Sequence, residues 1–139
     1  MQKEKRAQSI RYIINAAIIV LLVLIFYFGT RPPHIDITEN HVKISGLYGV
    51  ELRVDDIEQL QMRETLPPIK TRTNGMDLFG IARRGIYQLE ELGRTRMISF
   101  SAGGPFVLIH TGNEWIVINY KETDKTESLY QQLEAVVDN

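Results

Sequence analysis

The side chains that most often carry out chemistry are sparse in this chain and poorly spaced for it. Three histidines, His34, His41 and His110, lie far apart in the sequence, and there is no cysteine. None of the histidines belongs to an HxH or HExxH pair, the spacing at which two imidazoles reach one metal ion. The lack of cysteine also excludes a disulfide framework, a thiolate metal site and a cysteine nucleophile. The sequence therefore predicts neither a metal site nor a cofactor.

Serine and carboxylate patterns do not indicate an active site either. Ser99 and Ser101 alternate with apolar residues, as in a strand, and lack the G-x-S-x-G turn that exposes a nucleophile. Asp55 and Asp56 are neighbours, so their carboxylates point in different directions and supply too few oxygen ligands for a cation. No glycine-rich loop joins a predicted strand to a predicted helix, as phosphate binding requires. We expect the protein not to be an enzyme.

Basic residues in the middle of the chain form the one candidate binding site. They outnumber the nearby acidic residues, although the domain as a whole has more acids than bases. If they converge, they bind anionic lipid headgroups or wall polymers; if they do not, they are solvated charges on strand faces. The acidic balance of the domain argues against nucleic acid as a partner. The candidate residues for an anionic ligand or a partner are Lys70, Arg72, Arg83, Arg84, Arg94 and Arg96.

An apolar run at residues 12–29 is expected to be a transmembrane helix that anchors the domain. No charged side chain lies between Arg11 and Arg31, and 18 residues of helix cover about 27 Å, close to the ~30 Å hydrocarbon core. Tyr12 and Tyr27 stand where aromatic rings meet the two membrane interfaces. The run ends in FYFGTRPP, where a cleaved signal peptide usually has small residues. We therefore predict an uncleaved anchor and keep cleavage as the alternative.

The flanking charges set the predicted orientation. Residues 1–11 carry four basic side chains against one acid, whereas only Arg31 and Lys43 closely follow the run. By the positive-inside rule this is a single-pass protein of the cell membrane, with residues 1–11 as a cytoplasmic tail. Residues 30–34, which include two prolines, are predicted to form a stiff spacer. Residues 35–139 then form one extracytoplasmic domain.

The domain shows strand periodicity over most of its length. Apolar and polar residues alternate over residues 35–44, with a hairpin turn at 39–40, and again over 50–54, and Ile57, Leu60 and Met62 indicate a further strand. The segment TRTNG at 71–75 is typical of a turn, because Asn-Gly accepts positive backbone dihedrals. Further strands are predicted at residues 86–89, 97–102, 106–110 and 115–120.

The end of the domain changes to helical periodicity. Leu129, Leu133 and Val137 recur at helical spacing, with Thr123 or Asp124 available as the N-cap. About seven strands followed by one helix indicate an α+β domain. We expect a bent, partly open antiparallel β-barrel capped by the C-terminal helix.

Several short motifs follow one another in an unusual order in this domain. They are GLYG at 46–49, LPPIKTRTNG at 66–75, RGIYQL at 84–89, and WIVINY at 115–120 followed by T-x-x-L-Y at 126–130. Over residues 38–135 this order resembles the bacterial pleckstrin-homology-like (PH-like) domain family. The resemblance implies two near-orthogonal antiparallel sheets in a seven-stranded, partly open barrel, with the C-terminal helix at one end.

Two functions are compatible with these expectations. In the first, the domain is a protein-interaction or scaffolding module at the membrane surface. It docks a partner, or a second copy of itself, through its barrel edge or the loop from Pro67 to Arg84. In the second, it senses anionic lipid or a cell-wall polymer through the basic residues.

Overall fold

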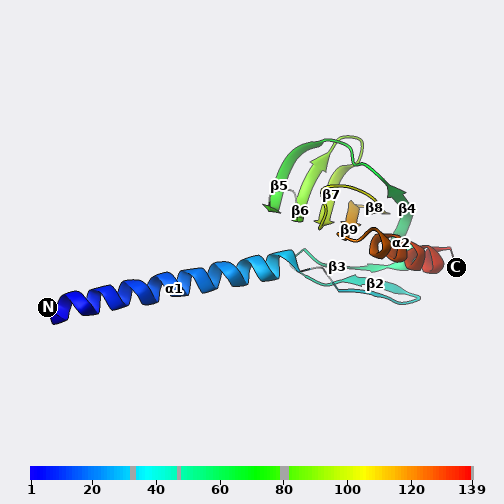
Figure 1. The fold of residues 1–139 in the computed structure, drawn as a ribbon. Coiled ribbons are helices and arrows are strands. Elements are labelled where there is room, and N and C mark those ends of the chain that lie inside the picture. Colours follow the sequence, from blue (N-terminus) through cyan, green and yellow to red (C-terminus); the bar gives the residue numbers. More distant parts are fainter. Residues whose placement is uncertain (32–33, 47, 79–81, 139) are drawn as a thin grey trace. The chain divides into compact units, whose positions relative to one another are not determined.

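The chain forms two compact units, Met1–Arg31 and Pro32–Asn139. The computed structural model describes residues 1–31, 34–46, 48–78 and 82–138. The first unit is one helix, α1 (Gln2–Thr30), which contains the predicted span and continues through most of the predicted tail (Figure 1). The two prolines of the predicted spacer, Pro32 and Pro33, lie outside the described residues.

Residues 12–28 of helix α1 are apolar around the whole circumference, with Asn15 as the exception. Its stretch Gln2–Phe28 has a mean hydropathy of 2.4 in its most apolar window, and none of that window is buried by protein. A helix that is apolar on every face needs an apolar surrounding. By length and composition α1 can therefore cross a membrane, and a signal sequence shares both properties.

The second unit begins with a small antiparallel sheet. It consists of β1 (Ile35–Ile37), β2 (His41–Ile44) and β3 (Val50–Arg53), in that order. The predicted hairpin is confirmed, because β1 pairs with β2 from Ile35 and Ile44 to Ile37 and Val42. A 3-10 turn, η1 (Val54–Asp56), leads to the larger sheet.

The larger sheet has six strands and is strongly curved (Figure 1). Its strands follow the order β4-β8-β9-β7-β6-β5, so β4 and β5 are its two edges. The strands are β4 (Ile57–Arg63), β5 (Ile69–Leu78), β6 (Ala82–Leu89), β7 (Gly93–Ser99), β8 (Phe106–Thr111) and β9 (Trp115–Asn119).

The strand count and the strand directions differ from the prediction. The described residues form nine strands in two sheets rather than about seven, and these residues form no closed barrel. Strands β7 and β9 run parallel, with Thr95 opposite Trp115 and Ser99 opposite Asn119, so the all-antiparallel expectation is wrong here. The physical reason is that residues 100–105 are a crossover rather than a hairpin turn. They carry the chain past the position that β9 later fills, and β8 then pairs with the far side of β9.

The predicted turn at TRTNG is also wrong, because these residues lie inside β5. Gly75 does have a positive φ of 140°, but it faces Gly85 of β6, whose φ is 144°. A Cβ on Gly75 would meet the backbone of Arg84 and Gly85. Glycine is therefore needed for the close approach of two strands rather than for a turn. Residues 79–81, between β5 and β6, lie outside the described part of the chain.

Two apolar clusters fill the domain, one on each face of the curved sheet. The first lies between this sheet, the small sheet and helix α2 (Thr123–Val137), and includes Ile98, Ile118 and Leu133. The second, which includes Leu108 and Val117, lies on the opposite face. Helix α2 is present as predicted, but Glu122 rather than Thr123 or Asp124 is its N-cap.

Candidate functional site

Strand β5 is the most exposed edge of the domain. Residues 69–74, which we call the β5 edge, are all exposed, although the strand pairs with β6 on one side. Two register shifts place Lys70 and Thr73 as extra residues on β5 without a partner position on β6. Such bulges add twist to an edge strand. Ile69, at the start of the edge, exposes 39 % of its surface.

The other sheet edges offer less backbone. Strand β4 lies against helix α2. In the small sheet the two edges, β1 and β3, have only three and four residues, against ten in β5. An exposed edge presents unpaired backbone donors and acceptors in proportion to its length. The β5 edge is thus the most extensive site for strand pairing in the described residues.

A cavity of about 410 Å³ adjoins the start of β5, and we call it the inner cavity. The segment that joins β4 to β5 forms one wall, with Leu66, Pro67 and Ile69. Met97 and Phe106, from β7 and β8, contribute apolar surface, and the crossover contributes Ala102. Glu64 and Arg83 also line the cavity, so it combines apolar surface with one acidic and one basic side chain.

A buried asparagine holds the crossover that borders this cavity. Asn119 is fully buried, and its Oδ1 accepts hydrogen bonds from Ser99 Oγ at 2.9 Å and from the backbone N–H groups of Phe100 at 2.9 Å and Ser101 at 3.3 Å. Its Nδ2 donates to the carbonyl oxygens of Ser101 and Gly103, at 3.2 and 3.1 Å. One side chain at the end of β9 thereby satisfies backbone groups that a crossover, unlike a hairpin, leaves unpaired.

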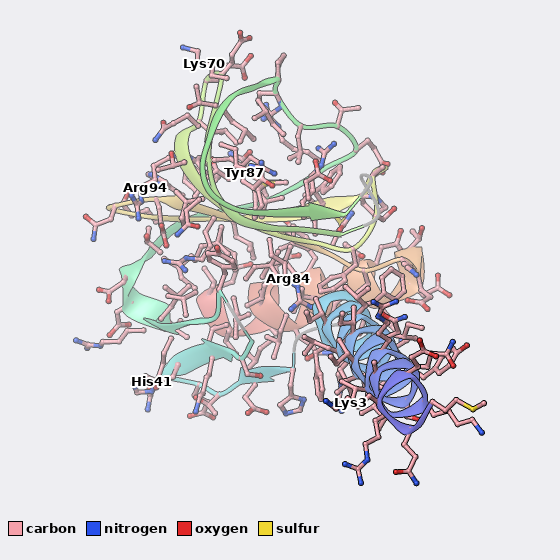
Figure 2. The ribbon with its side chains drawn as sticks, turned by 90° about the vertical axis from the view of Figure 1, so that its left-hand side faces the viewer. Lys3, His41, Lys70, Arg84, Tyr87 and Arg94 are labelled. Atoms are coloured by element: carbon pink, nitrogen blue, oxygen red, sulfur yellow. The ribbon has the colours of Figure 1, made fainter. Side chains whose placement is uncertain are left out.

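Tyr87 lies inside the curve of β5 and β6 (Figure 2). It is 2 % exposed, and Arg72 interacts with its hydroxyl. Burial raises the pKa of Tyr87, the charge of Asp77 raises it further, and Arg72 and Arg83 oppose the shift. Arg83 Nε lies 3.3 Å from Asp77 Oδ2, so the charge of Arg83 is compensated by a neighbour.

The candidate basic residues do not form one patch. Figure 2 shows Lys70, Arg84 and Arg94 at separate places on the domain. Arg94 and Arg96 share Glu114, at 3.4 and 2.8 Å, and Glu114 has only 11 % of its side chain exposed. Arg84 is buried, with its guanidinium 4.7 Å from the centre of the Phe100 ring. Lys70 and Arg72 are both exposed on the β5 edge, and Arg72 also interacts with Tyr87, its partner position on β6.

Sequence reasoning missed a link between the two sheets. Tyr48, in the loop between β2 and β3, donates a hydrogen bond from its hydroxyl to Asn74 Oδ1 at 3.1 Å. Its carbonyl oxygen accepts a bond from Arg96 Nη1 at 3.2 Å. The GLYG and TNG motifs thus meet in space, which their positions in the sequence did not indicate. The bond to Asn74 fixes the middle of β5, at the end of the β5 edge.

The residues considered for chemistry lie apart. His34 pairs with Asp36 at 2.9 Å and His110 with Glu58 at 3.2 Å, while the ring of His110 stacks on Trp115. Among the described residues, no three histidine or acidic side chains are grouped to hold a metal ion.

Comparisons with known proteins supply no further assignment. No protein-family model matches the chain, and no curated protein and no solved structure matches it significantly.

Proposed function

We propose that this protein is a non-enzymatic interaction module held at the surface of the cell membrane, and that it docks a protein partner at the β5 edge. The observation that carries the proposal is the exposure of residues 69–74 in a ten-residue strand at the end of the large sheet. Strand addition to such an edge gives affinity through main-chain hydrogen bonds. The compensated charges of Arg94, Arg96 and Arg83 favour this role over a sensor of anionic lipid or wall polymer.

The anchor in this proposal is α1, uncleaved, with its N-terminus in the cytoplasm and the domain outside. The 29 residues of α1 extend about 43 Å, enough to cross the ~30 Å hydrocarbon core. The excess of basic residues before the apolar run supports the orientation. Protease treatment of intact cells should digest the domain. An epitope placed before Lys3 should stay with the full-length protein, whereas its loss from the mature protein would identify α1 as a signal sequence.

The resemblance to the PH-like family is part of the same proposal. Its support is the short-motif order, the two sheets and the C-terminal helix that packs against them. The parallel pairing of β7 and β9 departs from the arrangement that the resemblance implies. The docking role rests on the β5 edge and does not depend on the family.

Photo-crosslinking in the native membrane tests the docking role. A photoreactive amino acid at Thr71 or Thr73 places the reactive group on the β5 edge. The matched position is Gln132, which is exposed on α2. We expect each of the two β5 positions to give one discrete crosslinked adduct with the same partner protein, and Gln132 on α2 to give none. Equal labelling at all three positions would refute docking at β5.

A further inference from the structure

The charge of the β5 edge is opposite to that of the domain that carries it. The unit Pro32–Asn139 contains 11 basic and 16 acidic side chains, a formal charge of −5. Between residues 65 and 76, however, Lys70 and Arg72 are the only charged residues, and both are exposed. An approaching strand therefore meets cationic side chains on an otherwise acidic surface.

This charge selects among partner strands. Opposite charges across neighbouring strands stabilise the pair by about 0.2–1 kcal/mol, and like charges destabilise it. Two copies of β5 placed edge to edge would bring Lys70 and Arg72 of each copy together. An acidic strand instead gains attraction to both residues. The edge thus favours an acidic partner over a second β5.

The inner cavity gives the edge a second recognition element. Ile69 belongs both to the β5 edge and to the cavity lining. A strand that pairs with β5 and extends past Ile69 reaches the cavity. In strand addition, side-chain pockets next to the edge give sequence specificity. The apolar walls, with Leu66, Met97 and Phe106, fit an aliphatic or aromatic side chain.

Building on the proposed docking function, we infer that the partner of β5 is an acidic, extended segment of another protein, and that one apolar side chain of this segment enters the inner cavity. The acidic residues pair with Lys70 and Arg72. The apolar residue fixes the register of the added strand beside Ile69.

Selection from a random peptide library tests this inference on the full chain in nanodiscs of zwitterionic lipid. We expect the selected peptides to alternate acidic with other residues and to share one apolar position. Selected peptides should lose binding when alternate backbone nitrogens are methylated, because strand pairing needs these donors. Replacement of the shared apolar residue by alanine should weaken binding about tenfold or more, as expected from 1.5–3 kcal/mol for a buried apolar side chain.

Two pairs of protein variants separate the two recognition elements. Lys70→Glu should weaken binding of the acidic peptides about two- to fivefold, whereas Lys121→Glu, at another exposed lysine, should not change it. Ala102→Trp places a large ring at the exposed rim of the cavity and should abolish the preference for the apolar residue. Ala135→Trp, on the exposed face of α2, is its control.

The outcomes distinguish this inference from the docking function. If the selected peptides were basic or uncharged, the inference that the partner is acidic would be wrong. If Ala102→Trp left binding unchanged, the inference that an apolar side chain enters the inner cavity would be wrong. In both cases crosslinked adducts at β5 would still support the docking function. Peptides that bind equally well after backbone methylation would overturn strand addition itself. Assembly of the protein with itself through β5, seen as adducts of twice the chain mass, would also overturn the inference.

Discussion

Replacement of Asn119 by alanine tests the central feature of the fold, the crossover that allows β7 and β9 to run parallel. The variant removes all five hydrogen bonds made by this fully buried side chain. The carbonyl oxygens of Ser101 and Gly103 can be hydrated, because Ser101 is half-buried and Gly103 is exposed. The backbone N–H of Phe100 is buried and cannot be hydrated. Leaving this donor without an acceptor costs about 1–3 kcal/mol. With a small cavity added, we expect a loss of about 2–4 kcal/mol in the free energy of unfolding.

Urea denaturation of the full chain in detergent, followed by the fluorescence of Trp115, measures this loss. Trp115 is the single tryptophan and lies in β9, so its signal reports on the domain rather than on α1. At about 4 °C per kcal/mol for a domain of roughly 100 residues, the midpoint of thermal unfolding should fall by about 8–16 °C. The control is Asn113→Ala, at an exposed turn position. A loss below about 1 kcal/mol, or one equal to the control, would refute the role assigned to Asn119.

Three further predictions concern single residues and use the same unfolding measurement. Glu114→Ala leaves two arginines without their shared partner and should cost about 1–3 kcal/mol, whereas Asp55→Ala, which breaks an exposed pair with Arg53, should cost under about 0.5 kcal/mol. Gly75→Ala should cost more than about 2 kcal/mol, because its Cβ meets the β6 backbone at a positive φ, whereas Gly112→Ala should be tolerated. Burial raises the pKa of Tyr87 in the folded state, so its contribution to stability is complete below the unfolded value of about 10 and is lost as pH rises through the folded pKa. Tyr87→Phe should therefore lessen the loss of stability above about pH 10; an unchanged alkaline profile would contradict this.

The spacing of apolar residues was sufficient to predict the elements that are determined by residues close together in the sequence. The apolar run predicted α1, the alternation around residues 39–40 predicted the β1–β2 hairpin, and the spacing of Leu129 and Leu133 predicted α2. Each of these depends on residues within a few turns or a few strand positions. The apolar pattern does not predict the boundaries of these elements as well. Helix α1 begins at Gln2 because the charged residues of the predicted tail are themselves good helix formers.

The elements that were missed depend on distant partners. Asn74-Gly75 was interpreted as a turn because nothing near it indicates that Gly85 will lie opposite. The parallel pair of β7 and β9 depends on Asn119, whose hydrogen bonds reach residues 16 to 20 positions earlier in the sequence. The basic residues were grouped by sequence proximity. Alternation along a strand, however, places Arg83 and Arg84 on opposite faces of β6, and an acid from another hairpin, Glu114, compensates Arg94 and Arg96.

The features that oppose pairing between two copies of the β5 edge also make the edge selective for its partner strand. A long exposed edge invites pairing with any extended chain, and a membrane anchor would concentrate copies of this domain on one surface. Bulges at Lys70 and Thr73 and the positive charge of the edge oppose pairing between copies. The positive charge of the edge does not oppose an acidic strand. The inner cavity beside Ile69 adds apolar contact for a strand that carries an apolar side chain at the matching position. Binding of the selected acidic peptides should accordingly weaken with added salt, while the contribution of the apolar residue should not, because screening acts on the exposed charges and leaves apolar burial unchanged. If salt weakened both contributions equally, the cavity would have no separate part in recognition.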